Sequence, residues 1–201
     1  MKRQLEAESY QVRDWIVNNI NLAEYFTTNG HFAQAEHCLQ AAFTVLPIDL
    51  GKKKKLRATL QMQMGRYYKN RLIFHVDNFL QSKELLNDVV HKKFVEYDTL
   101  KLKWPQIKDI ENIEEAKMIF RLSNTQLLKA LEVYVLDGYV TENIEINKDI
   151  SCIYRYLSSM EDDSGRFEAM QCRRHKVLAE IEQELNPKAY EGYCTELQVE
   201  L

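Results

Sequence analysis

The sequence predicts an all-α protein made of antiparallel helical hairpins, and three observations support this prediction. Only six Gly and three Pro interrupt the 201 residues, so long helices are easier to build than a sheet with many turns. Apolar residues recur at helical spacing over most of the chain. Hydrophobic residues make up 45% of the chain, which is enough for a packed core.

The segment 21–47 defines the hairpin. Ala23 and Ala35 allow two helices to approach closely, Gly30 supplies the turn, and Pro47 lacks the N–H that the second helix would need to continue. We therefore expect helices over 11–28 and 32–45. This spacing is typical of tetratricopeptide repeats, whose hairpins stack into a right-handed superhelix.

One very long helix is expected next, from Lys52 to about Glu96. Apolar residues recur there every three to six positions without a proline, and a break near Gly65 or at 81–82 is an alternative. Residues 98–105 alternate leucine and lysine before a proline, which indicates an extended connector.

The remaining sequence predicts five more segments. Acidic residues at 114 and 115 suit the first turn of a helix that stops at Gly138. Residues 139–146 are expected to be extended, and a short helix over 148–159 follows, marked by apolar residues at helical spacing.

The last two helices are expected to meet at Asn186 and Pro187. The first has an apolar face between Phe167 and Leu185 and ends at this dipeptide. The dipeptide also suits the start of a last helix, with Asn186 as N-cap, which runs to Leu201 without a stop signal. We therefore expect a truncated array of repeats.

The strongest non-structural signal is a basic tract between Asp49 and Asp77, which contains no acidic residue. Its members are Lys52, Lys53, Lys54, Lys55, Arg57, Arg66, Lys69 and Arg71. Nucleic acid or an anionic membrane would suit such a tract. Runs of this kind are more often a solvated face or a contact with protein, which is the interpretation we favour.

No catalytic, cofactor, metal or small-molecule site is predicted. His31, His37 and Cys38 come nearest to a metal cluster, but their spacing does not converge on one point, and we expect surface histidines and a small core thiol. The glycines form no phosphate-binding loop. Four widely spaced cysteines indicate free thiols, and neither a signal peptide nor a membrane-spanning run is present, so a cytoplasmic location is expected.

Five strings occur along the chain in this order: KRQLE at 2–6, AEHCLQAA at 35–42, EEA at 114–116, DGYVTENIEI at 137–146 and LNPKAY at 185–190. Taken together, they resemble the KIF-binding protein family of cytosolic helical-repeat regulators of kinesin motors. The resemblance implies a hairpin that ends an N-terminal repeat subdomain (1–47), a linker helix with its connector (48–112), and a truncated C-terminal repeat subdomain (113–201).

The resemblance also implies a function without a reaction. Members of the family clasp kinesin motor domains in a concave face and so regulate their attachment to microtubules, which implies a cytoskeleton-associated protein of microtubule-based (axonal) transport. In repeat geometry the first helix of a pair lines that face. The positions expected to bind the partner are Glu6, Tyr10, Arg13, Val17, Ile20, Glu24, Thr27 and Thr28.

One feature departs from the family pattern. The loop 48–55 is short and lysine-rich, whereas the family has a long acidic loop there, and like charges would oppose a basic motor surface.

Two other functions remain as alternatives. A generic tetratricopeptide adaptor that captures a peptide tail is the second hypothesis, although such clamps use Lys, Arg and Asn rather than Glu24, Thr27 and Thr28. Nucleic-acid binding through 52–71 is the third.

Overall fold

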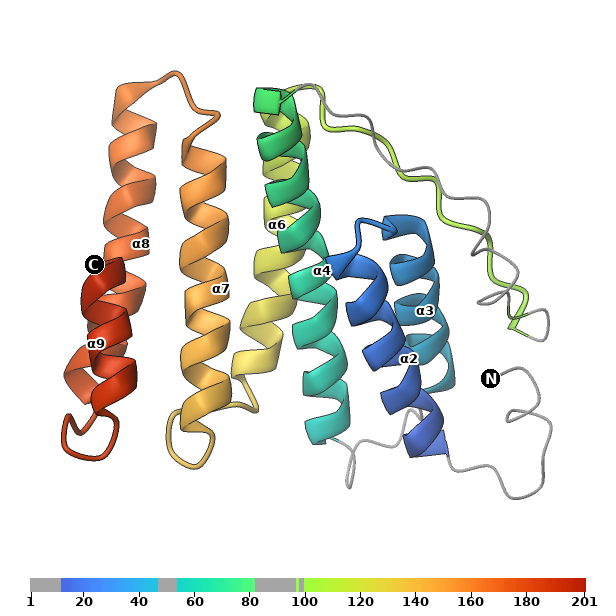
Figure 1. The fold of residues 1–201 in the computed structure, drawn as a ribbon, viewed down its shortest axis with the longest axis horizontal. Helices are drawn as coiled ribbons and strands as arrows, with labels where there is room; N and C mark the ends of the chain where they lie inside the picture. Colours follow the sequence, from blue (N-terminus) through green and yellow to red (C-terminus); the bar gives the residue numbers. More distant parts are fainter. Residues whose placement is uncertain (1–11, 47–53, 82–96, 98–99) are drawn as a thin grey trace.

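The computed structural model describes residues 12–46, 54–81, 97 and 100–201. This part of the chain contains seven α-helices and no strand, which confirms the all-α class. The helices are α2 (Val12–Thr28), α3 (Phe32–Val45), α4 (Lys54–Gln81), α6 (Ile113–Leu131), α7 (Val140–Ser158), α8 (Ser164–Glu184) and α9 (Glu191–Glu200). Figure 1 shows them side by side, with α2 and α3 at one end, α4 in front of α6, and α7, α8 and α9 at the other end.

The hairpin of α2 and α3 forms as the sequence predicts, with helix bounds within one residue of those expected. Gly30 adopts a φ of +77°, the left-handed conformation that glycine takes without steric cost. Ala23 and Ala35 are fully buried between the two helices, which confirms their role in close approach.

Helix α4 runs through Gly65 without a break. A Cβ atom added at Gly65 would lie 2.6 Å from Leu127 Cγ, and the Ser123 hydroxyl donates a hydrogen bond of 2.8 Å to the Gly65 carbonyl. Gly65 therefore allows α4 and α6 to approach closely. The predicted helix is confirmed over 54–81, and the alternative of a break at Gly65 is wrong. The expected continuation of the helix over 82–96 lies outside the described residues.

The connector between α4 and α6 is non-helical over residues 102–111, and the sequence predicts an extended segment over 98–105. The side chains of Tyr97 and Trp104 pack against the core of α2 and α3. Ile110 packs instead between α4 and α6. The connector thus fastens the first hairpin to the rest of the molecule.

Helix α6 begins as predicted and ends early. The side chain of Asn112 accepts a hydrogen bond from the Glu115 N–H (3.0 Å) as the N-cap. The helix ends at Leu131 rather than near Gly138, because residues 132–139 form turns. The Asn143 side chain supports them by donating to the Tyr134 carbonyl (2.7 Å).

The helix predicted over 148–159 is confirmed and ends at Ser158, but the extended segment predicted over 139–146 is wrong, since the same helix, α7, already begins at Val140. Residues two apart on a helix point in directions about 200° from each other. Ile144 packs against α8 and α9, whereas Ile146 packs against α4 and α6. Helix α7 is therefore buried on two opposite sides.

The last helix begins four residues later than predicted. Asn186 stabilises a turn through two hydrogen bonds. Its side-chain oxygen accepts one from the Lys188 N–H (3.0 Å), and its backbone carbonyl accepts one from the Tyr190 N–H (3.0 Å). Helix α9 starts at Glu191, and its residues Cys194 and Leu197 are buried in a cluster with α7 and α8. The last helix is therefore packed against its neighbours at these two positions.

Among the described residues, the buried side chains form three clusters that follow one another along the row of helices. The first joins α2, α3, α4 and the connector, the second joins α4, α6 and α7, and the third joins α7, α8 and α9. Helices α4 and α7 each belong to two clusters and hold the row together. Within the described residues, no helix has the length and hydropathy needed to cross a bilayer.

Candidate functional site

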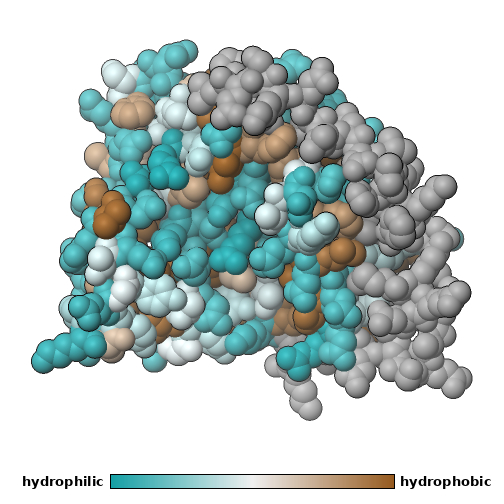
Figure 2. Space-filling model, in the orientation of Figure 1, coloured by the Kyte–Doolittle hydropathy of each residue, from teal (hydrophilic) through white to brown (hydrophobic). Residues whose placement is uncertain are grey.

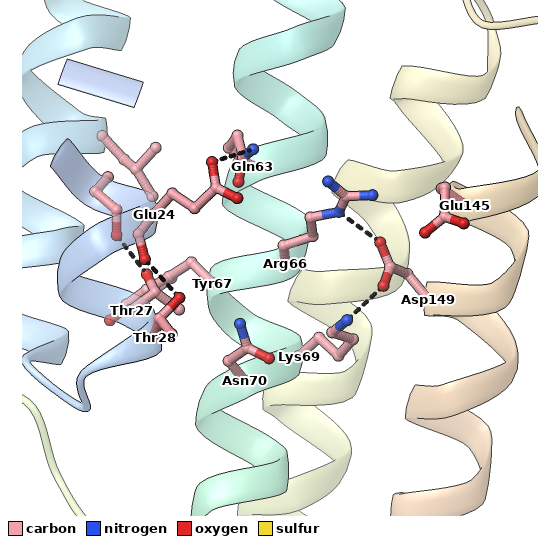
Figure 3. Close-up of a pocket in the computed structure, with 12 residues that line it drawn as sticks. Glu24, Thr27, Thr28, Gln63, Arg66, Tyr67, Lys69, Asn70, Glu145 and Asp149 are labelled. Atoms are coloured by element: carbon pink, nitrogen blue, oxygen red, sulfur yellow. Dashed lines mark hydrogen bonds and ion pairs between the residues drawn. The ribbon is translucent and has the colours of Figure 1, made fainter. Parts of the chain in front are cut away.

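A groove lies on one face of the molecule, with α4 as its floor and α2 and α7 as its walls (Figure 3). Its pocket has a volume of about 260 Å³. The residues that line this α2–α4–α7 groove are Ala23, Glu24, Thr27, Thr28, Leu39, Gln63, Arg66, Tyr67, Lys69, Asn70, Glu145 and Asp149. Figure 2 shows hydrophilic side chains gathered over the middle of this face.

The floor and the α7 wall are joined by three charged side chains. Arg66 Nε donates a hydrogen bond to Asp149 Oδ2 (2.7 Å), and Lys69 Nζ donates to Asp149 Oδ1 (Figure 3). Only 9% of the Asp149 side chain is exposed, against 25% for Arg66 and 17% for Lys69. Hydrogen bonds between charged groups are stronger than neutral ones, so this triad holds α4 to α7.

The α2 wall presents one exposed carboxylate and two hydroxyls. Glu24 is exposed and accepts a long hydrogen bond from Gln63 Nε2 on the floor (3.4 Å). The Thr27 hydroxyl donates to the Ala23 carbonyl (2.7 Å), and the Thr28 hydroxyl donates to the Glu24 carbonyl (3.0 Å). Each hydroxyl keeps lone pairs that can accept a hydrogen bond from a partner.

A second pocket of about 500 Å³ continues the groove toward the turn between α2 and α3. The two pockets share Thr27, Thr28 and Asn70. The second pocket adds apolar side chains, among them Phe74, and the carboxylate of Asp77. Together the pockets offer a surface with a polar part and a more apolar part, which suits a protein segment better than a small substrate.

The structure places the sequence-predicted positions in three different environments. Glu24, Thr27 and Thr28 line the groove, and their role in binding stays a prediction. Glu6 and Tyr10 lie outside the described residues. Three positions belong to α2 but not to the groove: exposed Arg13, half-buried Val17, and Ile20, which is 3% exposed and packs in the core.

Nine of the twelve lining residues escape the sequence-based prediction of the binding site. Gln63, Arg66 and Asn70 lie at helical spacing on one face of α4, and this polar stripe was the signal that could have found them. Glu145 and Asp149 are also four residues apart on one helix face. Their relation was hidden because residues 139–146 were predicted to be extended.

Four of the eight residues of the basic tract make contacts within the molecule. Arg66 and Lys69 pair with Asp149, as described above. Arg71 is buried and donates to the Lys108 carbonyl (3.2 Å), and the Lys55 ammonium lies over the Tyr139 ring at 4.7 Å. These four residues thus contact other parts of the molecule, whereas Lys52 and Lys53 lie outside the described residues.

His37 and Cys38 on α3 are both core residues. His37 is buried rather than on the surface as expected, and it stacks on Tyr97 with ring centroids 5.5 Å apart. Cys38 is fully buried, as predicted, and burial raises the pKa of its thiol to about 12, which disfavours the reactive thiolate. Among the described residues, no group of three or more His, Cys, Asp or Glu side chains could hold a metal ion.

Comparison with known proteins identifies related sequences. The model of the family described as KIF-1 binding protein C terminal matches residues 75–201. The KIF-binding protein of Rattus norvegicus is 27% identical over 248 residues, and that of Homo sapiens is 26% identical over 244. Both alignments include 100% of this chain and 39% of the relative. The KIF-binding protein of Drosophila melanogaster is 24% identical and aligns with 98% of the chain.

This chain thus spans about two fifths of the length of the curated relatives that it matches. No solved structure matches it significantly.

Proposed function

The chain belongs to the KIF-1 binding protein family, and on this premise we propose that it is a non-enzymatic scaffold that binds kinesin motor domains. By binding them it would regulate their attachment to microtubules, and hence microtubule-based transport. The proposal rests on the name that the relatives carry, KIF-binding protein, and on the presence of an open groove on the face that α2 lines.

The geometry supports recognition of a protein surface. Glu24, Thr27 and Thr28 present an exposed carboxylate and two hydroxyl acceptors to one side of the groove, and the neighbouring pocket adds Phe74. Protein interfaces combine polar rims with apolar anchors in this way. The groove is the single observation on which the location of the site depends.

The proposal also covers the subcellular location of the protein and the division of its chain into subdomains. A kinesin partner implies a cytoplasmic, cytoskeleton-associated protein. We also propose that α4 links two repeat subdomains, within 1–47 and 113–201, because its side chains contribute to the buried clusters on both sides.

A pull-down of purified kinesin motor domains by the purified chain, with and without microtubules, tests the proposed function. We expect the chain to retain motor domains and to lower the fraction bound to microtubules. Retention of no motor domain, by this chain or by a full-length relative, would contradict the proposal.

Replacement of Glu24 by lysine tests where the partner binds. Because it reverses the charge of the α2 wall, we expect Glu24→Lys to weaken motor binding about tenfold. Asp14→Lys makes the same charge change on an exposed residue of the same helix outside the groove, and it should leave binding unchanged. Equal effects of the two variants would remove the groove from the proposed site.

One observation favours a second candidate, an adaptor that captures the carboxyl end of a peptide. The groove contains Arg66, Lys69 and Asn70, which are the residue types that such clamps use, although the sequence suggested only Glu24, Thr27 and Thr28. A fluorescent peptide with a free carboxyl end, compared with its amidated form, tests this candidate. Tighter binding of the free acid would support it.

A further inference from the structure

We propose that Asp149 is the specificity-determining residue of the α2–α4–α7 groove, because it pairs with both cations on the floor and so makes the groove select a cationic segment of its partner. This inference rests on the proposed function for the identity of the site. It goes further by naming the chemistry of the partner segment, which contains lysine or arginine side chains.

The pairing uses both oxygens of one carboxylate. Asp149 Oδ2 accepts from Arg66 Nε at 2.7 Å, while Oδ1 accepts from Lys69 Nζ. Asp149 is the most buried of the three side chains, and it enters the groove from α7, whereas both cations come from α4 (Figure 3). Each cation therefore has a fixed partner before any ligand arrives.

The remaining charges of the lining are acidic. Glu24 and Glu145 enter from the two opposite walls, so that the lining contains three carboxylates and two cations, a formal net charge of −1. Glu145 Oε1 also lies 3.3 Å from Lys148 Nζ. The same ammonium forms a second ion pair with Glu196 Oε2, at 2.9 Å. A cationic side chain between the walls would meet carboxylates on both sides.

Without Asp149 the same residues would favour the opposite ligand. Arg66 and Lys69 would lose their shared anion, and with Asn70 they would offer donors to a carboxylate, as in the second candidate function. Asp149→Asn removes one negative charge with little change of shape, which brings the lining to a formal charge of zero. The residue therefore decides between the two candidate ligands.

The test measures the binding of two fluorescent probes by anisotropy, a lysine–serine repeat peptide and its glutamate–serine counterpart. We expect the unaltered chain to prefer the lysine peptide. Asp149→Asn should weaken lysine-peptide binding about fivefold and strengthen glutamate-peptide binding, since partly exposed charge pairs are worth up to ~1 kcal/mol.

A double variant separates this role from a structural one. Asp149→Asn with Lys69→Gln lacks the ion pairs of the triad but returns the lining to a formal charge of −1, so we expect the preference for the lysine peptide to recover. If Asp149 served only to fasten α4 to α7, the double variant would bind no better than the single one. Thermal unfolding of each variant confirms that the measured chains are folded.

Three results would overturn the inference: an unaltered chain that binds neither peptide or prefers glutamate, a single variant without a changed preference, or a double variant without recovery. Because the peptides contain no kinesin sequence, these results are independent of the motor pull-down. Binding of motor domains that is insensitive to Asp149→Asn would leave the proposed function in place and refute this inference alone.

Discussion

The close approach of α4 and α6 at Gly65 makes a quantitative prediction about the alanine variant. Alanine is favoured over glycine inside a helix by about 1 kcal/mol, so Gly65→Ala should stabilise α4 if packing were ignored. The added Cβ would however lie 2.6 Å from Cγ and 2.7 Å from Cδ2 of Leu127, and 3.3 Å from its backbone N. Leu127 is fully buried, so it has no room to move.

The packing effect should exceed the propensity effect. Overpacking of a core costs typically ~1–3 kcal/mol, and separation of the helices would also strain the hydrogen bond from Ser123 to the Gly65 carbonyl. We therefore expect Gly65→Ala to lower the free energy of unfolding by about 1–2 kcal/mol, measured by urea denaturation with far-UV circular dichroism. Gly192→Ala on α9 is the control, because nothing lies within 4 Å of its added Cβ.

Truncation of Leu127 should reverse the sign of the effect that Gly65→Ala has on the free energy of unfolding. Leu127→Ala alone is expected to cost about 2–5 kcal/mol through the cavity that it leaves. In that background Gly65→Ala fills space instead of clashing, and it should raise the free energy of unfolding by about 1 kcal/mol. The double-mutant cycle then gives a coupling of about 2–3 kcal/mol. Additive effects of the two substitutions would refute the reasoning, because the residues would not be in contact.

Two further predictions concern buried titratable groups. Burial and the nearby Arg71 lower the pKa of His75, while Asp109 acts in the opposite direction. The Nδ1 atom of the neutral ring accepts a hydrogen bond from the Ile110 N–H (3.4 Å). This histidine therefore binds a proton more readily in the unfolded chain than in the folded one. The free energy of unfolding should fall as the pH drops below about 6.5. His75→Gln should weaken this pH dependence, as measured by denaturation curves at several pH values. Buried Cys38, whose pKa is raised to about 12, should resist a thiol reagent at neutral pH until urea unfolds the chain, whereas exposed Cys172 should react at once. Rapid labelling of Cys38 in the folded protein, found by peptide mass spectrometry, would contradict its position in the core.

Local rules were sufficient where one helix face meets one neighbour. The hairpin of α2 and α3 follows from Ala23, Gly30 and Ala35, since a stop, a turn and small residues at helical spacing specify its bounds. Such rules fail for α7, where Ile144 and Ile146 pack into different clusters on opposite sides. A helix buried on both sides loses the single apolar face by which sequence patterns identify helices.

The groove was predictable only in the part that repeat geometry supplies. The first helix of the pair gave Glu24, Thr27 and Thr28, which do line it. The pairing of Arg66 with Asp149 joins residues 83 positions apart, and no local pattern indicates which acid faces which base. Gly65 gave a similar ambiguity, because a glycine within a helix marks either a break or a close approach, and only the position of Leu127 decides between them.

The dissociation constant of a kinesin motor domain, measured for the unaltered chain and for Glu24→Lys and Asp14→Lys by isothermal titration calorimetry, tests the central claim most directly. We predict saturable binding by the unaltered chain, a loss of about tenfold in affinity for Glu24→Lys, and no change for Asp14→Lys. The claim that the α2–α4–α7 groove binds the motor is contradicted if no motor domain of a purified panel binds, or if the two lysine variants have the same affinity.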